Sequence, residues 1–526
     1  MRLFAGIVLF AGVVVLALAM LAGAAPAASF AFVLLGEGRD GQPVPMARAV
    51  VENASTCPDL TLASGQRQPM IPRGRPALGQ FGGVLVCEAR YPWDQPASIT
   101  VGATRHDLPV ARRGIPRRVV VLGDSGCRGQ AERRPQSCIG DGYDKIWPFG
   151  ILSRESTEDR PDLIVHVGDY NYRGTPHFLE LPSSATGYAR EVRIRVFDTG
   201  DLDDEDENPS FPIGPGYFSQ NVPGSPRLDN WPDWRDDFFI PSSRLLVTAP
   251  WVFTRGNHEL CSRAGPGWFY LLDSGSELLG GARGQAVCPP QLPADWRPGH
   301  WPDPALPFAG QTFPTLPTLP FRLKLGGLDL VVFDSSDAGD ALVYAREHYV
   351  AQYARVAAML ADGTPTWLLT HRPIWGVVHP AKGIASLDSG YGFINLTQQL
   401  AVATAFPDGM PPNLKTVISG HMHRFQATGF DGKRPPQLVV GTGGMELSSS
   451  RPIPSPADPK RPIRVPDLDG TVGFVVGLSD FGAMDMRVGD RGDWSSALVG
   501  IGGQTLAICD SRWPTRGSGR SVCALK

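Results

Sequence analysis

Five short apolar runs in this sequence each end in a glycine or threonine that is followed by a residue able to bind a metal ion. The segments are RRVVVLGD, DLIVHVGDYNY, VFTRGNHE, WLLTH and VISGHMH, and the residues are Asp124, Asp169, Asn257, His371 and His421. A strand that turns through glycine at its carboxyl end brings backbone and a short side chain close to a bound ion. One such turn is weak evidence, but five in this order indicate a metal site.

Two further donors, Tyr172 and His423, follow closely on these turns. The full set suits two first-row metal ions rather than one, and it consists of Asp124, Asp169, Tyr172, Asn257, His371, His421 and His423. We expect Asp169 to be shared, because its two carboxylate oxygens can bridge ions about 3.5–4 Å apart. The phenolate of Tyr172 is a hard anionic donor that favours Fe(III), although neighbouring Tyr170 competes for this role.

The length of 526 residues leaves room for one large catalytic domain and a smaller one, and the hydrophobic content of 42% is ordinary for a buried core. The net charge of -3 gives no global basic field, so no nucleic-acid binding surface is evident. An anionic substrate must therefore be attracted by local charge.

The N-terminal segment is typical of an export signal. Arg2 precedes an apolar stretch over residues 3–21, and the small-residue run AGAAPAAS follows with predicted cleavage near Ala24 or Ala27. An uncleaved anchor is the alternative, because the apolar stretch approaches the roughly 20 residues of a spanning helix. We expect a secreted or periplasmic protein that has no membrane contact once the signal is cleaved.

Eight cysteines beyond this segment fit an oxidising compartment. Eight cysteines permit about 105 connectivities, and the positions favour pairs of sequence neighbours. The predicted pairs are Cys57 with Cys87, Cys127 with Cys138, Cys261 with Cys288, and Cys509 with Cys523. Reduced, buried cysteines are the alternative.

The pattern along the chain predicts a signal peptide over 1–28, a small β domain over 29–115, a catalytic domain over 116–505 and a disulfide-tied tail over 506–526. Residues 29–115 alternate apolar and polar positions between turns rich in Pro and Gly, whereas the third segment alternates short strands with helix-like stretches. This alternation predicts a mixed α/β sheet whose loops collect at one edge. Long loops are expected at 199–232, 286–320 and 451–468.

The motifs resemble those of the calcineurin-like metallophosphoesterases, and within them the purple acid phosphatase type. The blocks of that family appear here as GDSG 123–126, GDYNY 168–172, GNHE 256–259, LLTH 368–371 and GHMH 420–423, and the fourth departs only in having Leu368 for Val. The resemblance covers about residues 116–480. It implies an α+β metallophosphoesterase sandwich of two mixed sheets flanked by helices, after a small N-terminal β domain.

The resemblance also divides the donors between two ions. Many relatives carry a metal-binding histidine where this chain has Gly126, and here a tyrosine stands at 172. One set, which would hold Fe(III), consists of Asp124, Asp169, Tyr172 and His423. The other, which would hold a divalent Fe, Zn or Mn ion, consists of Asp169, Asn257, His371 and His421.

Two such ions can clamp a phosphoryl oxygen and activate a shared water as hydroxide for in-line attack on phosphorus. His258 follows Asn257, so its side chain should diverge toward the substrate and stabilise the transition state or protonate the leaving oxygen. Arg128, Arg173 and His379 are further candidates for substrate contact. We expect an exported hydrolase of phosphate monoesters.

Two alternatives remain open from the sequence. The first is a phosphodiesterase that acts on nucleotide or phospholipid substrates with the same ions. The second is a non-catalytic extracellular binding protein that retains the fold.

Overall fold

The structure is a computed structural model. It describes residues 28–77, 79–127, 136–138, 146–172, 229–260, 264–280, 283–288, 318–336, 338, 340, 346–378, 392–448, 462–467, 469–513 and 521–526. The predicted signal segment up to residue 27 and most of the three predicted long loops lie outside these residues.

The larger sheet of the described chain has eleven strands in the order β25-β24-β23-β22-β9-β10-β11-β1-β2-β6-β5. Four neighbouring strands near its middle, β9, β10, β11 and β1, are parallel, and the strands outside them pair antiparallel. The strands are β1 (Ser29–Glu37), β2 (Pro43–Glu52), β5 (Ile71–Pro72), β6 (Val84–Arg90), β9 (Arg118–Leu122), β10 (Leu163–His166), β11 (Trp251–Phe253), β22 (Gly482–Val488), β23 (Trp494–Gly500), β24 (Thr505–Asp510) and β25 (Cys523–Leu525).

The second sheet has eight strands in the order β12-β13-β14-β17-β19-β18-β21-β20. Its central strands β13, β14, β17 and β19 are parallel. The strands are β12 (Phe321–Lys324), β13 (Asp329–Phe333), β14 (Thr366–Thr370), β17 (Leu414–Ser419), β18 (Phe425–Phe430), β19 (Gln437–Val440), β20 (Ile463–Pro466) and β21 (Val472–Leu478). A separate hairpin pairs β15 (Gly376–Val378) with β16 (Gly392–Ile394).

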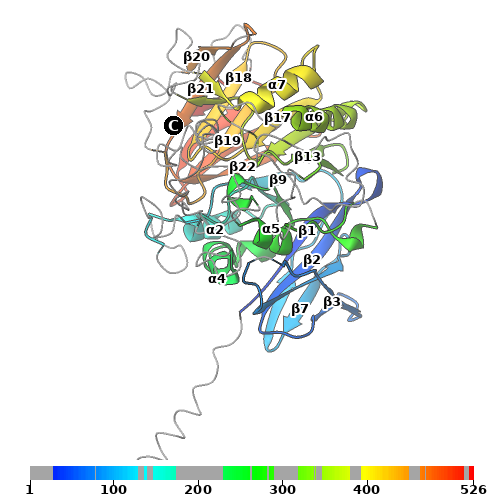
Figure 1. Ribbon diagram of the computed structural model, residues 1–526. Helices are drawn as coiled ribbons and strands as arrows, with labels where there is room; N and C mark the ends of the chain where they lie inside the picture. The colour runs from blue at the N-terminus through cyan, green and yellow to red at the C-terminus, as the bar shows by residue number, and fades with distance from the viewer. Residues whose placement is uncertain are drawn as a thin grey trace, which may run out of the picture.

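The two sheets pack face to face, and helices cover their outer faces (Figure 1). Side chains alternate across β9, so that Val119 and Val121 enter the core between the sheets while Val120 and Leu122 enter the core on the other face. Helices α6 (Arg346–Leu360) and α7 (Leu396–Ala405) cover the smaller sheet. The described chain is therefore an α+β protein with mixed sheets, as predicted at that level.

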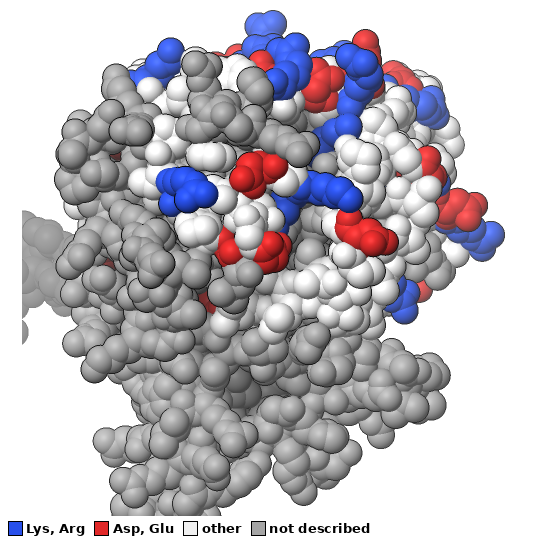
Figure 2. All heavy atoms as spheres, turned by 90° about the horizontal axis from the view of Figure 1, so that it is seen from above, with Lys and Arg blue, Asp and Glu red and all other residues white. Residues whose placement is uncertain are grey.

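Helices α2 (Phe149–Glu158), α4 (Trp231–Trp234) and α5 (Gly265–Leu271) lie on the outer side of the larger sheet (Figure 1). Short helical turns occur at η1 (Arg39–Gly41), η3 (Arg235–Phe239), η4 (Leu245–Val247), η5 (Asn257–Glu259) and η6 (Glu277–Leu279). Figure 2 shows Lys and Arg atoms beside Asp and Glu atoms on the described part of the face seen from above. That surface therefore mixes both signs of charge.

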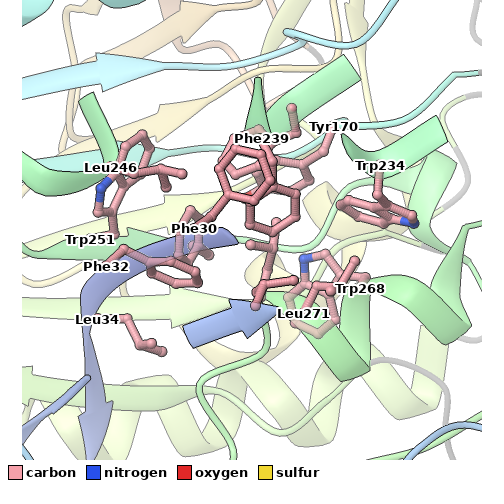
Figure 3. Packing of buried hydrophobic residues seen from close by; sticks show 14 of the residues in the cluster. Phe30, Phe32, Leu34, Tyr170, Trp234, Phe239, Leu246, Trp251, Trp268 and Leu271 are labelled. Carbon is pink, nitrogen blue, oxygen red and sulfur yellow. The ribbon is translucent and has the colours of Figure 1, made fainter. Parts of the chain in front are cut away.

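Aromatic side chains fill the core between the larger sheet and α2, α4 and α5. Phe30 and Phe32 of β1 pack with Phe239 of η3, with ring centroids 5.3 and 6.3 Å apart (Figure 3). Tyr170 enters the same core from the loop after β10, and its ring stacks 4.1 Å from His166. This core anchors the loop that carries Asp169 and Tyr172.

The strands of residues 29–115 divide between two sheets. Strands β1, β2, β5 and β6 belong to the larger sheet, where Leu34 of β1 pairs in parallel with Trp251 of β11. The other four form a separate sheet in the order β4-β3-β7-β8, and they are β3 (Asp59–Leu62), β4 (Arg67–Pro69), β7 (Ala97–Val101) and β8 (Thr104–Leu108). Sheet hydrogen bonds therefore cross the predicted domain boundary at residue 115, and the division itself stays a prediction.

Three of the four predicted disulfides are present, and they join Cys57 to Cys87, Cys127 to Cys138, and Cys509 to Cys523. Cys288 is also disulfide-bonded, and its predicted partner Cys261 lies outside the described residues. These bonds fit an oxidising compartment. Within the described residues, the helices are too short and too polar to span a bilayer.

A buried charge cluster joins the larger sheet to the end of α5. Arg48 of β2 and Arg73 lie 3.1 and 2.7 Å from Glu88 Oε2, and all three side chains are buried. Arg48 also donates to the carbonyls of Leu271 and Asp273 at 3.1 and 2.9 Å. Burial raises the pKa of Glu88, whereas the charges of Arg48 and Arg73 and the hydrogen bonds from Ser276 and Arg73 lower it, and the net pKa lies below the usual value.

We predict that Glu88→Ala lowers the free energy of unfolding by about 3–5 kcal/mol, because it leaves two guanidinium groups buried without their carboxylate. The pKa of Glu88 is lowered on folding, so its contribution is present above the unfolded pKa and is lost as pH falls through the folded value. Urea unfolding at neutral and acidic pH measures both effects.

Asp107→Ala is the matched control, because Asp107 pairs with Arg105 at 2.8 Å on the exposed surface. Its loss should leave stability nearly unchanged. Equal destabilisation by the two substitutions would contradict the role of the buried cluster.

Candidate metal centre

The carboxyl ends of parallel strands from both sheets meet at one edge of the molecule. Strands β9, β10 and β11 of the larger sheet lead into Asp124, Asp169 and Asn257. Strands β14 and β17 of the smaller sheet lead into His371 and His421. All five side chains are buried, and the contacts below bring them together.

The first donor set, Asp124, Asp169, Tyr172 and His423, surrounds the Tyr172 hydroxyl. Its Oη lies 3.2 Å from Asp124 Oδ1, 3.0 Å from Asp169 Oδ2 and 3.1 Å from His423 Nε2. One hydroxyl proton cannot satisfy all three neighbours. The hydroxyl of Tyr170 instead donates to the carbonyls of His166 and Thr254, at 3.2 and 2.9 Å, so Tyr172 is the phenol that lies among the candidate ligands.

The second donor set, Asp169, Asn257, His371 and His421, surrounds the amide oxygen of Asn257. Asn257 Oδ1 lies 2.7 Å from His371 Nε2 and 3.0 Å from His421 Nδ1. His371 Nε2 also lies 3.3 Å from Asp169 Oδ2, the same oxygen that contacts Tyr172. Asp169 is therefore common to both donor sets.

The hydrogen bonds of His371 show why the second donor set fits a cation. His371 Nδ1 lies 2.8 Å from the carbonyl oxygen of Val167, which only accepts, so Nδ1 donates this hydrogen bond and Nε2 is the nitrogen that can offer a lone pair to a cation. The lone pair of Nε2 then faces the lone pairs of Asn257 Oδ1. Ligand atoms bound to one ion at about 2.0–2.2 Å lie roughly 3–3.5 Å apart. The observed spacing is close to that range.

One group of described residues, Asp124, Asp169 and His371, brings its ligand atoms within 4.8 Å of one another and could hold a metal ion. Burial, followed by the charge of Asp169, raises the pKa of Asp124. Burial also raises the pKa of Asp169, whereas the interactions with His371 and His258, including their hydrogen bonds, lower it, and its net pKa is below the usual value. The pKa values of these two neighbouring acidic groups therefore shift in opposite directions.

Burial and the charges of Asp169 and Asp124 raise the pKa of the Tyr172 phenol well above its usual value. Ionisation of this phenol therefore requires a compensating positive charge nearby. The same crowding of acidic groups would be relieved by a bound cation.

The backbone is held in an unfavourable conformation at three of the candidate ligands. Asp124, Asp169 and His421 have φ values of 56°, 60° and 74°, in the left-handed region. Each such residue costs about 1–3 kcal/mol, and such residues cluster at functional sites. Glycine precedes two of the ligand turns for steric reasons, because a Cβ on Gly256 would lie 2.0 Å from Asp169 Oδ1 and one on Gly420 would lie 2.3 Å from Asp124 Oδ2.

His258 lies beside the first donor set. Its ring centroid is 3.9 Å from that of Tyr172, and its backbone N–H donates to Asp169 Oδ1 at 2.9 Å. The side chain is 4% exposed, so solvent reaches it only slightly. Arg128, Arg173 and His379, the other candidates for substrate contact, lie outside the described residues.

Glu259 has a positioning role that the sequence did not reveal. Its Oε2 accepts the backbone N–H groups of Asp169 and Gly256, at 3.0 and 3.1 Å, and its Oε1 accepts those of Tyr170 and Asn171, at 2.9 and 3.2 Å. Burial and the charge of Asp169 raise the pKa of Glu259 to about 8, and these N–H donors act in the opposite direction. The acidic residue after GNH was visible in the sequence, but its partners were not.

Asp340 and Arg372 are two further residues that sequence reasoning missed. Asp340 Oδ2 lies 2.8 Å from His421 Nε2 and 2.7 Å from Arg372 Nη1. Burial raises the pKa of Asp340, whereas the charge of Arg372 and the interactions with His421 and Asn395 lower it, and its net pKa lies below the usual value. Asp340 lies outside every motif block, so no sequence signal marked it.

The structure thus brings all seven candidate ligands together in two donor sets. No protein-family model and no curated protein matches this chain. The assignment of a function therefore depends on the donor sets themselves.

We predict that Glu259→Gln weakens metal binding by about 10- to 100-fold, the usual effect of removing a partner that orients the ligands. The amide has one oxygen in place of two, so either the Asp169 and Gly256 N–H groups or the Tyr170 and Asn171 N–H groups lose their acceptor. Competition with a chromophoric chelator measures the affinity.

Glu277→Gln is the control, because Glu277 is an exposed residue of η6. It should bind metal as the wild type does. Unchanged affinity in Glu259→Gln would show that the carboxylate does not order the ligand turns.

Proposed function

We propose that this protein is a metal-dependent phosphoesterase with a dinuclear site, of the calcineurin-like metallophosphoesterase family and the purple acid phosphatase type. The observation that supports this most directly is the position of Asp169 Oδ2. It lies 3.0 Å from Tyr172 Oη in the first donor set and 3.3 Å from His371 Nε2 in the second. A carboxylate in contact with both donor sets is placed where it would be shared by two ions.

The chemistry of each donor set favours a different ion. The first contains two carboxylate groups, one phenolate and one imidazole. Hard anionic oxygen donors of this kind suit Fe(III). The second contains the shared carboxylate, a neutral amide oxygen and two imidazoles, which suit a divalent Fe, Zn or Mn ion. When bound, two such ions polarise a phosphoryl oxygen and activate a water for in-line attack on phosphorus.

The residues of the chain then position the substrate and move one proton. The backbone N–H of His258 is fixed on Asp169 Oδ1 at 2.9 Å, which places its imidazole beside the first donor set. From there, His258 donates a proton to the leaving oxygen or stabilises charge on the phosphoryl group. With a net charge of -3 on the chain, this local site rather than a global field attracts the phosphate.

Phosphate monoesters are the proposed substrates, and export to the cell exterior or the periplasm is the proposed location. The three disulfides of the described chain support the location. The phosphodiesterase and the non-catalytic binding protein are the outcomes that the following experiments distinguish.

We predict that Tyr172→Phe abolishes a visible absorption band of the iron-loaded protein. The substitution removes only Oη, the atom that contacts all three partners of the first donor set. A phenolate bound to Fe(III) gives a charge-transfer band, and phenylalanine cannot. A colourless, fully active wild-type enzyme with its metal in place would exclude the tyrosinate assignment.

We predict that metal-loaded protein hydrolyses p-nitrophenyl phosphate faster than the bis ester, and that His258→Ala lowers kcat for the monoester by about 10²- to 10⁴-fold. The metal content of this variant should stay near the wild-type value, because His258 lies beside the donor sets. Steady-state kinetics and metal analysis on the same preparation measure both quantities.

His106→Ala is the matched control. His106 belongs to β8 of the four-stranded sheet, which supplies none of the candidate ligands, and its ring contacts Ser29 Oγ at 2.9 Å. It should leave kcat unchanged. Loss of metal from His258→Ala would make His258 a ligand, faster hydrolysis of the bis ester would favour the phosphodiesterase, and a metal-loaded protein inactive on both esters would favour the binding protein.

A further inference from the structure

The imidazole of His421 lies between two oxygen atoms. Its Nδ1 is 3.0 Å from Asn257 Oδ1, and its Nε2 is 2.8 Å from Asp340 Oδ2. A neutral imidazole has one N–H group, so only one of these two contacts can be a hydrogen bond. The nitrogen that carries the proton decides whether Nδ1 offers a lone pair to the second donor set.

Asp340 is held rigidly beside this ring. Arg372 Nη1 donates to its Oδ2 at 2.7 Å, and Asn395 Nδ2 donates to its Oδ1 at 2.7 Å. The carboxylate is fully buried. Both of its oxygens are thus fixed by donors from other elements, and Oδ2 still has a lone pair directed at His421 Nε2.

Arg372 makes the alternative tautomer of His421 accessible. Its Nη1 lies 3.0 Å from His421 Nε2, so an unprotonated Nε2 would accept a hydrogen bond from the guanidinium. In that tautomer Nδ1–H would donate to Asn257 Oδ1, and no lone pair would face the second donor set. Each tautomer of His421 therefore forms hydrogen bonds with the same neighbours, and only one of the two can be present in a given molecule.

We infer that Asp340 is a positioning residue that selects the Nε2–H tautomer of His421 and so presents Nδ1 to the second donor set. A hydrogen bond from N–H to a carboxylate is about twice as strong as one to a neutral amide oxygen. Asp340 therefore outweighs Asn257 as the acceptor. His371 has the opposite arrangement, because its Nδ1 donates to the backbone carbonyl of Val167 and its Nε2 faces the second donor set.

Part of this inference rests on the proposed function, since it makes binding of the second ion depend on Asp340. A carboxylate that fixes the tautomer of a ligand histidine typically changes metal affinity by about 10- to 100-fold. Asp340 lies in the segment after β13, outside the motif blocks that supply the ligands. The selection of the tautomer does not require a metal and can be tested without one.

The experiment is ¹⁵N-histidine NMR of the metal-free protein, with the His421 signals assigned through His421→Gln. In the wild type, His421 should carry its proton on Nε2, and in Asp340→Asn the proton should move to Nδ1. Asp340→Asn should also bind the second metal equivalent about 10- to 100-fold more weakly, while the absorption band assigned to Tyr172 is kept.

Asp273→Asn is the matched control, because Asp273 is also a buried carboxylate paired with an arginine, Arg283, at 2.8 Å. It should change neither the tautomer nor the metal affinity. A wild-type His421 protonated on Nδ1 overturns the inference, and so does an Asp340→Asn protein that keeps both the Nε2–H signal and the affinity. An equal loss of affinity in Asp273→Asn overturns it as well.

The wild-type spectrum decides the question even if Asp340→Asn fails to fold. Wild-type protein that binds no metal would contradict the proposed function, and the tautomer of His421 would still test the role of Asp340. The two failures are therefore distinguishable.

Discussion

Hydrogen bonds that cross between the two sheets at their shared edge hold the candidate site together. The His371 ring, at the end of β14, contacts the carbonyl of Val167 at 2.8 Å. The backbone N–H of His421, after β17, donates to both carboxylate oxygens of Asp124 at 3.0 Å. A buried ion pair of 3.2 Å between Arg255 and Asp334 joins the ends of β11 and β13 in the same way. Neither sheet alone supplies a complete donor set, so the spacing of the sheets fixes the spacing of the ligands.

The packing on both faces of the larger sheet stabilises this edge against its own strain. Three ligand turns have left-handed backbone, and the acidic side chains in them repel one another. The aromatic core around Tyr170 holds the Asp169 turn from one side (Figure 3). The apolar core between the sheets holds the strands from the other side. Strain of this kind persists only where the surrounding structure determines the conformation.

The sequence pointed to the candidate ligands, but it did not point to the residues that support them. Asp124, Asp169 and Asn257 could be found because each follows an apolar strand at a glycine, and parallel strands end at one edge. Asp340 could not be found, because its contact with His421 joins residues far apart in sequence without a local signal. The pairing of β1 with β11 was missed for the same reason, since a strand followed by turns reads as part of a local β domain. The sequence left Tyr170 as a competitor of Tyr172 for the role of phenol ligand, and the packing of Tyr170 in the aromatic core distinguishes the two.

The order of strands in the larger sheet has a consequence for biosynthesis. Strand β9, which leads into Asp124, pairs with β10 on one side and with β22 on the other, and β22 lies near the far end of the chain. During synthesis, one side of β9 therefore has no native partner until the distant strand β22 has been made. Unpaired strand edges are templates for aggregation. The parallel core of the larger sheet is therefore closed on the β9 side only by a strand that is distant in sequence.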